Sequence, residues 1–530
     1  MKRVLTLTLL VLGCTGLLPL AVAGVTSSGA GSPALVANRV PGETWSRYAD
    51  PAKAGWSIAK LAEARAFWES LDSAAWMVVE NGVVVVAWGD CERRYMCHSV
   101  RKSLLSGMYG VHVDAGTIDT QKTLAQLDID DEPKLTEMER RARIEDLLRA
   151  RSGVYKLAAY EPPQNPKPDR GTHEPGTFWC YNNFDFNTLG TIFEQETGTK
   201  IFEEFGTCFA QPLGMQDYRA RDGYYHFELD KSIHPAYPFR LSARDCARYG
   251  LLFLNDGMWG DERILSQAWI ERSTASYSDT GSPGGGYGYM WWTFDDANTP
   301  GLSGYTARGV GGQTIAVLPQ AGLVVVNRTD TYMGHNVDSR ENMQLMGMIL
   351  AARSGAVESE ASLVHMEPAS TATPKLDADQ VARYVGAYEP SGVPVNLRAE
   401  EGVLLFELDQ RGVFGLLPVA GSDSVFLVED RELHIFISRP AKGGDGTMIS
   451  ELTLLREFDA HLEQRAFERA QAVAERALET FPMSAMAHVM LGRVFQANGD
   501  PALARDLVEA AFELDAEHDE ARVLARSLER

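Results

Sequence analysis

The residues best suited to chemistry begin with a serine and a lysine three positions apart, Ser99 and Lys102. Apolar residues recur at helical spacing after the serine and predict a helix that starts there: Val100, Leu104, Leu105, Met108 and Val111. Positions i and i+3 share one face of a helix, so the hydroxyl and the amine can touch. A lysine that burial makes neutral can take the serine's proton and activate it for attack on a carbonyl group. Taken alone, the pair is more typical of a helix cap.

A second candidate is Tyr181-Asn182-Asn183, which lies in an aromatic stretch running from Phe178 to Phe184. A phenol relays protons between a nucleophile, an amine and a leaving group, so Tyr181 is a candidate proton carrier. The Asn183 amide can donate to a substrate carbonyl group and accept from Lys102. By itself, the tripeptide is more typical of a turn beside an aromatic cluster.

A third candidate is the glycine-rich stretch Gly309-Val310-Gly311-Gly312-Gln313, which precedes the apolar run Thr314–Leu318. Glycines beside a strand allow a substrate to approach the backbone closely, so Gly311 and Gly312 are candidate substrate-binding residues. The backbone N–H of Gln313 is a candidate donor to an oxyanion. A glycine bulge on an edge strand is the alternative interpretation.

The order and spacing of these three motifs resemble the serine β-lactamase and penicillin-binding-protein superfamily. The likeness covers roughly residues 60–350 and is greatest to class C β-lactamases, D-alanyl-D-alanine carboxypeptidases and their esterase-like relatives. Further stretches support it: Leu147–Val154, Pro212–Met215, Ser242–Asp245 and Tyr287–Trp292. The resemblance implies an acylated Ser99 with Lys102 as its base. It further implies that Tyr181 carries a second proton, that Asn183 positions the substrate, and that the Ser99 and Gln313 amides form an oxyanion hole.

One position departs from the pattern of that superfamily. Its β-lactamases and peptidases carry Lys-Thr-Gly, or His in place of the Lys, where this chain has Val310-Gly311-Gly312. The cation that would hold a substrate carboxylate is therefore missing, although Arg308 lies nearby in the sequence. We therefore expect a serine hydrolase that forms a Ser99 acyl-enzyme from an ester or amide. One alternative is a β-lactamase or D-alanyl-D-alanine carboxypeptidase, and another is a non-catalytic scaffold that binds cell-wall peptides or proteins.

Other motifs give little support to rival chemistry. The sequence has no G-x-S-x-G, H-E-x-x-H or Walker phosphate-loop pattern, and we expect no metal and no organic cofactor. His98 adjoins Ser99, but neighbouring residues of a helix point apart, so we expect it only to tune the pocket. Ser152 and Ser242 are expected in turns or at helix N-termini. Trp291 and Trp292 are expected in the core or in a pocket wall.

The elements that must position these residues are predicted to form an α+β domain over residues 56–355. We expect an antiparallel sheet flanked by helices, together with a helical subdomain. Trp76–Val79 and Val83–Trp88 are β-rich and are separated by Asn81-Gly82, which predicts a hairpin. Two further strands are predicted at Thr314–Leu318 and Leu323–Asn327, so one sheet would unite both ends of the domain.

The rest of the chain divides by composition and by hydrophobic period. Residues 356–377 are predicted to be a linker, and residues 378–456 a small β-sandwich or barrel. Residues 457–530 are predicted to form a tetratricopeptide-like helical tail. The tail has a repeat of 34 residues, in which Ala470 corresponds to Ala504 and Ala477 to Ala511. About two repeats fit, so the tail is either a helical cap or a module that binds a protein partner.

The N-terminus predicts export. Residues 1–23 resemble a secretory signal peptide, with Lys2 and Arg3 before an apolar run and Ala21-Val22-Ala23 at its end. Residues 24–55 would follow as an extended lead-in. We expect a periplasmic protein. Lipid attachment at Cys14 or secretion is the alternative.

Cysteine count and charge set further limits. Five cysteines follow the predicted signal peptide, and Cys91 and Cys97 are close enough in sequence to pair. A formal net charge of −22 with no Lys/Arg stripe argues against a nucleic-acid partner. No later stretch approaches the roughly 20 apolar residues of a membrane span. The expected partner is a small-molecule or peptide substrate with an ester or amide bond.

Overall fold

A computed structural model describes the chain from residue 39 onward. The described residues are 39–161, 166–282, 284–295, 303–354, 361–366, 376–388, 395–400, 402–408, 412–419, 424–429, 434–438, 447–515 and 518–529. The predicted signal peptide (residues 1–23), the alternative lipid-attachment residue Cys14 and residues 24–38 of the lead-in lie outside them.

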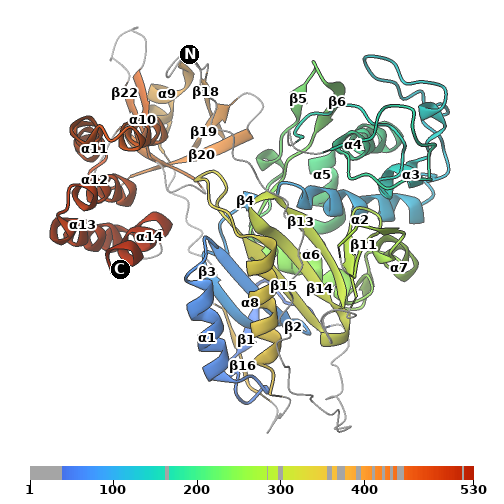
Figure 1. Ribbon diagram of the computed structural model, residues 1–530, viewed down its shortest axis with the longest axis horizontal. Coiled ribbons are helices and arrows are strands. Elements are labelled where there is room, and N and C mark those ends of the chain that lie inside the picture. Colours follow the sequence, from blue (N-terminus) through green and yellow to red (C-terminus); the bar gives the residue numbers. More distant parts are fainter. Residues whose placement is uncertain are drawn as a thin grey trace. The chain divides into compact units, whose positions relative to one another are not determined.

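Within the described residues, ten strands form the central sheet of the N-terminal part (Figure 1). They lie side by side in the order β10-β11-β12-β13-β14-β15-β2-β3-β1-β16. Their bounds are Ser46–Tyr48 (β1), Ala75–Glu80 (β2), Val83–Gly89 (β3), Ser278–Asp279 (β10), Gly285–Tyr287 (β11), Trp292–Phe294 (β12), Gly304–Gly309 (β13), Gln313–Leu318 (β14), Leu323–Arg328 (β15) and Leu363–His365 (β16). Because β15 pairs antiparallel with β2, one sheet unites the two ends of the domain, as predicted.

Helices and short hairpins surround this sheet, which confirms the predicted α+β class. The α-helices are Ile58–Trp68 (α1), Val100–Asp114 (α2), Ile144–Leu148 (α3), Asn183–Thr197 (α4), Ile201–Phe205 (α5), Ala243–Leu254 (α6), Gln267–Thr274 (α7) and Ser339–Ala351 (α8). The shorter helical turns are Glu139–Arg141 (η1), Gly206–Ala210 (η2), Ala220–Asp222 (η3), Val310–Gly312 (η4) and Pro319–Ala321 (η5). The remaining short strands are Tyr95–Met96 (β4), His226–Glu228 (β5), Ser232–Ala236 (β6), Arg240–Leu241 (β7), Met258–Trp259 (β8) and Glu262–Arg263 (β9).

The predicted hairpin between β2 and β3 forms as its turn residues require. Asn81 has φ 45° and Gly82 has φ 82°, so both adopt the left-handed conformation that a tight type I′ turn needs. The strands predicted at Thr314–Leu318 and Leu323–Asn327 correspond to β14 and β15.

The two faces of the sheet carry different helical layers, because alternate residues of a strand point to opposite sides. On β2, Trp76 and Val78 join an apolar cluster with residues of α1 and α8. Met77 and Val79 join a larger cluster with residues of α2, α4 and α6. Helix α2, which begins after Ser99, therefore lies in the layer opposite α1 and α8 and also contacts β13.

The far edge of the sheet extends beyond the predicted domain limits. Strand β1 lies inside the range predicted as an extended lead-in, and β16 lies inside the range predicted as a linker. The two strands pair antiparallel, with Ser46 opposite His365, and β1 also pairs with β3. Both segments are too short to show a periodic pattern, and their pairing with the sheet determines their structure.

A second sheet follows, in the range predicted as a small β-sandwich or barrel, and that assignment stays a prediction. In the described residues, seven strands form one antiparallel sheet in chain order, from β17 to β23. Their bounds are Gly386–Tyr388 (β17), Val395–Glu400 (β18), Val403–Leu408 (β19), Gly412–Pro418 (β20), Val425–Val428 (β21), His434–Ser438 (β22) and Thr447–Ser450 (β23), and Ala378–Tyr384 forms α9. Leu397, Leu404 and Ile437 are buried in its core, together with Tyr384 of α9.

Five helices make up the described part of the tail. They are Glu451–Glu463 (α10), Phe467–Thr480 (α11), Ala485–Ala497 (α12), Pro501–Leu514 (α13) and Asp519–Leu528 (α14). Helix α10 begins before residue 457, the predicted start of the tail. The alanines that recur at 34 residues, Ala470 and Ala504 and then Ala477 and Ala511, are all fully buried. Their burial agrees with close helix packing, and the tetratricopeptide assignment stays a prediction.

The cysteine prediction is wrong in one respect. Cys91 and Cys97 do not pair, and all five cysteines of the described chain are free thiols. Both are buried, Cys91 after β3 and Cys97 after β4. In the part of the chain that the structure covers, no helix combines the length and apolar character needed to cross a membrane.

The close packing of α2 on α7 gives a test of the fold. A Cβ atom on Gly110 of α2 would lie 2.4 Å from Cδ1 of Trp269, so Gly110→Ala is expected to destabilise the protein by about 1–3 kcal/mol. Gly347 of α8 has no atom within 4 Å of the same position, so Gly347→Ala should stabilise by roughly 0.5–1 kcal/mol. Thermal unfolding of both variants, followed by tryptophan fluorescence, measures the difference. Equal melting temperatures would contradict the packing described.

Candidate active site

Three side chains from two distant segments converge at the start of α2. Ser99 is the N-cap residue of α2, Lys102 lies one turn later, and Tyr181 immediately precedes the N-cap of α4. The Lys102 Nζ atom lies 2.7 Å from Ser99 Oγ and 2.7 Å from Tyr181 Oη. The structure thus brings the hydroxyl, the amine and the phenol into one hydrogen-bonded cluster.

Burial determines the charge state of Lys102. The residue is only 2% exposed, and this burial is the main reason why its pKa falls well below the ordinary value. The neighbouring Arg101 charge lowers the pKa further, whereas Glu161 opposes the shift. The direction favours the neutral amine, which has the lone pair needed to accept a proton from Ser99.

Tyr181 keeps its proton in the resting site. Burial raises its pKa to about 12, against the opposing effects of its hydrogen bond with Ser99 and of the Arg101 charge. Its ring lies 5.0 Å from that of Phe186 and 5.3 Å from that of Trp292, centroid to centroid. These contacts fix the phenol so that it can donate a proton to a leaving group.

Arg101 is a residue whose importance the sequence analysis missed. It is fully buried, donates to Asn187 Oδ1 at 2.8 Å and lies over the Tyr237 ring, 4.2 Å from its centroid. Its Nε and Nη1 atoms have no hydrogen-bond partner in the described part of the chain. The buried charge therefore acts on Lys102, its neighbour in sequence. No local pattern in the sequence marks its burial, because Lys102 and Ser103 follow it and make the start of the helix polar.

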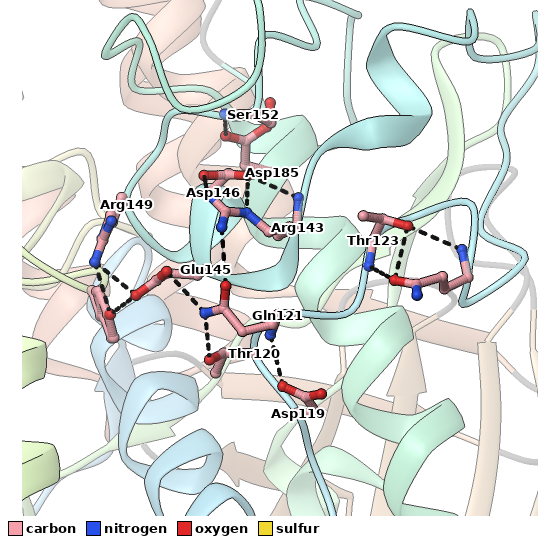
Figure 2. Close-up of polar contacts among 12 residues, drawn as sticks. Asp119, Thr120, Gln121, Thr123, Arg143, Glu145, Asp146, Arg149, Ser152 and Asp185 are labelled. Carbon is pink, nitrogen blue, oxygen red and sulfur yellow. Dashed lines mark hydrogen bonds and ion pairs between the residues drawn. The ribbon is translucent and has the colours of Figure 1, made fainter.

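A polar network holds the first turn of α4, directly after Tyr181 (Figure 2). Ser152 Oγ donates to Asp185, and Asn182 caps α4 by accepting from the Phe184 N–H at 3.1 Å. Ser152 Oγ also accepts from the Val154 N–H at 3.0 Å, a local contact typical of a turn, and Ser242 is the N-cap of α6, so both lie as expected. Figure 2 also shows a second group of contacts at the start of α3, which includes the ion pair of Arg143 and Asp146.

Asn183 is placed differently from the expectation. Its Nδ2 donates to the carbonyl oxygen of Tyr160 at 2.5 Å, and its Oδ1 is buried with no partner in the described residues. The expected hydrogen bond between Asn183 and Lys102 does not form. The Asn183 side chain therefore holds the segment around Tyr160, and its Oδ1 is the acceptor left unused.

The glycine-rich turn packs against the loop that follows β15. Gly311 and Gly312 have φ of 80° and 85°, and Cβ atoms there would lie 2.2 Å from Thr331 Cγ2 and 2.3 Å from Val337 O. Gln313 is fully buried, and its Nε2 donates to Thr329 O at 2.6 Å. The loop that follows β15 therefore requires these three residues.

Gly309, the first residue of this stretch, lies beside the residues that precede Ser99. A Cβ atom on Gly309 would lie 2.5 Å from Cys97 O and 3.2 Å from His98 Cβ, so the backbone passes directly beside the start of α2. Val310 follows, is 58% exposed and begins η4, where the first N–H groups have no partner within the turn. The Val310 amide is therefore a better candidate than Gln313 for the second oxyanion donor, alongside the Ser99 amide.

His98 ties this turn to the other side of the site. Its Nε2 lies 2.7 Å from Thr331 Oγ1, and its Nδ1 lies 2.6 Å from Tyr160 Oη. Burial lowers the pKa of His98 to about 4, so the ring stays neutral. Its φ of 48° is left-handed, and both hydrogen bonds help to hold that strained conformation next to Ser99.

An open cavity of about 910 Å³ adjoins the cluster at Tyr181. Its lining includes the charged residues Arg151, Lys167 and Asp279 and the aromatic residues Phe178, Trp179, Tyr181, Tyr277 and Trp292. The two neighbouring tryptophans divide the expected roles, because Trp292 lines this cavity whereas Trp291 is fully buried in the core. The cavity offers room for an apolar or aromatic part of a substrate.

Comparisons with known proteins agree with this arrangement. The family model for beta-lactamase matches residues 60–341. No curated protein matches the chain.

Solved structures that resemble the chain do so at low identity. The octameric penicillin-binding protein homologue from Pyrococcus abyssi is 17% identical, with a TM-score of 0.42 over 74% of this chain and 97% of its own. EstCE1, a hydrolase with promiscuous acyltransferase activity, is 18% identical, with a TM-score of 0.43 over 57% of this chain and 100% of its own. A penicillin binding protein from Bacillus halodurans is 15% identical, with a TM-score of 0.42 over 54% of this chain and 99% of its own.

The effect of Arg101 on Lys102 is testable by the pH dependence of acylation. Since Lys102 accepts a proton only as the neutral amine, the rate of Ser99 acylation should rise with pH through the Lys102 pKa. Removing the nearby positive charge raises that pKa, so Arg101→Met should move the acidic limb upward by about one pH unit. Arg101→Lys keeps the charge and should leave the limb close to its original position. Rates of fluorophosphonate labelling between pH 5 and 10 give the pH at which acylation begins to rise. If that pH is the same in Arg101→Met as in the wild type, Arg101 does not lower the pKa of Lys102.

Proposed function

The chain belongs to the beta-lactamase family, and we propose that it is a serine hydrolase that cleaves an ester or amide through an acyl-enzyme on Ser99. The observation that carries the proposal is the position of the Lys102 amine, 2.7 Å from Ser99 Oγ and 2.7 Å from Tyr181 Oη. Burial of that amine supports its role as a base, because the neutral form is the one favoured there.

In the first half of the reaction, Ser99 Oγ bonds to the substrate carbonyl carbon while its proton passes to Lys102, directly or through Tyr181. The carbonyl oxygen becomes an anion, which the N–H groups of Ser99 and Val310 stabilise. Collapse of this intermediate breaks the bond to the leaving group, which departs with a proton from Tyr181 or Lys102. The product of this half-reaction is an ester of Ser99.

In the second half, water attacks the Ser99 ester and gives its proton to the same basic cluster. The Ser99–acyl bond then breaks, Ser99 Oγ recovers a proton, and the free acid leaves. The aromatic walls around Tyr181 suit an apolar or aromatic group on the substrate.

A specific observation keeps a carboxylate-bearing substrate as the second candidate, which would correspond to a β-lactamase or D-alanyl-D-alanine carboxypeptidase. Arg308 is exposed on β13 and lies over the Trp292 ring, 5.6 Å from its centroid. Trp292 in turn borders Tyr181. Arg308 thus offers a cation two residues before Val310, the position that lacks the lysine of the usual motif.

The ends of the chain support two lesser proposals. We propose that residues 1–23 direct export to the periplasm, with lipid attachment at Cys14 or secretion as the alternative. We also propose that helices α10–α14 serve as a docking module for a protein partner or as a cap on the chain itself.

Labelling of the nucleophile tests the main proposal. A fluorophosphonate should label the protein once, and Ser99→Ala should abolish labelling, because the substitution removes the hydroxyl that Lys102 activates. Ser70→Ala, at an exposed serine, serves as the matched control and should label normally. Mass spectrometry after incubation with p-nitrophenyl esters, anilides and nitrocefin would then identify the acyl group. Undiminished labelling of Ser99→Ala would reject this nucleophile, and no adduct with any reagent would favour a non-catalytic scaffold.

Substitution of Arg308 separates the two substrate classes. If substrates carry a carboxylate bound by Arg308, Arg308→Ala should lower kcat/KM for them roughly ten- to a hundredfold, as loss of a charge-assisted contact predicts. Neutral p-nitrophenyl esters should be unaffected, and Arg308→Lys should restore part of the loss. Equal rates for wild type and Arg308→Ala on nitrocefin and on D-alanyl-D-alanine peptides would remove Arg308 from substrate binding.

A further inference from the structure

Three side chains with metal-ligating groups meet at the end of α2 opposite Ser99. They are His112, Glu204 and Cys208, and one ligand atom from each lies within 4.8 Å of the other two. His112 Nε2 is 2.8 Å from Glu204 Oε1, and Cys208 Sγ is 3.3 Å from the same oxygen. An imidazole nitrogen, a carboxylate oxygen and a thiol sulfur therefore converge on one point.

The secondary structure around each of the three residues determines where its side chain points. His112 lies in the last turn of α2, and its ring meets Phe193 edge-on at 5.2 Å between centroids. Glu204 belongs to α5 and Cys208 to the π-helical turn η2 that continues it, so the two side chains, four residues apart, project on one side. Single π-helical turns of this kind occur often at functional sites. All three residues are partly buried, so water can still reach them.

We infer that His112, Glu204 and Cys208 bind a divalent transition-metal cation of the zinc type, with its fourth position open to water. Nitrogen, oxygen and sulfur donors together match the borderline preference of Zn²⁺, whereas Mg²⁺ and Ca²⁺ take oxygen alone. Tetrahedral bonds of about 2.0–2.3 Å set the ligand atoms roughly 3.3–3.7 Å apart. The distances from Glu204 Oε1 to His112 Nε2 and to Cys208 Sγ, 2.8 Å and 3.3 Å, must open slightly to admit the ion. On binding, Cys208 releases its thiol proton to solvent and coordinates as the thiolate.

The site is a clamp between helices, separate from the chemistry of acylation. Helix α2 rises about 1.5 Å per residue, so His112 lies roughly 20 Å along the helix from Ser99. An ion bound there would link the last turn of α2 to α5. The hydrogen bond between His112 and Glu204 already joins these two helices. The sequence holds no sign of it, because His112 and Glu204 are 92 positions apart and no Cys-x-x-Cys pair is present.

Co²⁺ is a suitable probe of this site. When bound to a thiolate it shows a charge-transfer absorption band, which can be measured independently of enzyme activity. Co²⁺ is titrated into the full chain, freed of any polyhistidine tag and treated with a chelator. We expect one equivalent to produce the charge-transfer band and added Zn²⁺ to abolish it. Cys208→Ser should remove the band, and His112→Asn should weaken binding roughly 100-fold or more.

A matched control separates this site from surface binding of metal. His365 is exposed on β16, and His365→Asn should titrate as the wild type does. Fluorophosphonate labelling of Ser99 in every variant reports whether the fold is intact, and if Cys208→Ser fails to fold, the wild-type spectrum and His112→Asn decide. The inference is overturned by absence of the band in the wild type, by its persistence in Cys208→Ser, or by unchanged affinity in His112→Asn.

Discussion

Exclusion of water from a single amine is the constraint on which the rest of the site depends. Lys102 is 2% exposed, and its pKa is lowered mainly by that burial and then by Arg101. The surrounding elements all keep water away from this amine. Helix α2 carries Lys102, and Tyr181, just before α4, contacts its Nζ atom. The side of α2 that faces the sheet is packed with apolar residues. A hydrated Lys102 would be a cation, which cannot act as a base toward Ser99.

Much of the fold was predictable because its long elements have clear periods. The β2–β3 hairpin follows from two left-handed turn residues between apolar runs, and the pairing of β15 with β2 follows from strands at both ends of one domain. Strands β1 and β16 were not predictable. Each is only three residues long, so tertiary pairing rather than sequence pattern makes it a strand. The second sheet was predicted as β structure, but alternation along strands does not determine whether a sheet folds over on itself.

The candidate active site was likewise predictable only in part. Helical spacing places Ser99 and Lys102 on one face, and only the resemblance to a family linked them to Tyr181. The Gln313 amide stays a prediction as oxyanion donor, with the Val310 amide as a second candidate, because glycines in a turn do not reveal which amide points inward. The close approach of Gly309 to Cys97, visible only in three dimensions, favours the Val310 amide. Arg101 and the unused Asn183 Oδ1 likewise depend on burial, which no local pattern records.

The pairing of β1 with β16 has a consequence for how such a chain can change. The first and last strands of the hydrolase part lie next to each other, with Ser46 opposite His365, at the edge of the sheet away from β13. New termini made elsewhere and a short peptide joining the old ones would therefore yield a circular permutant with the sheet order intact.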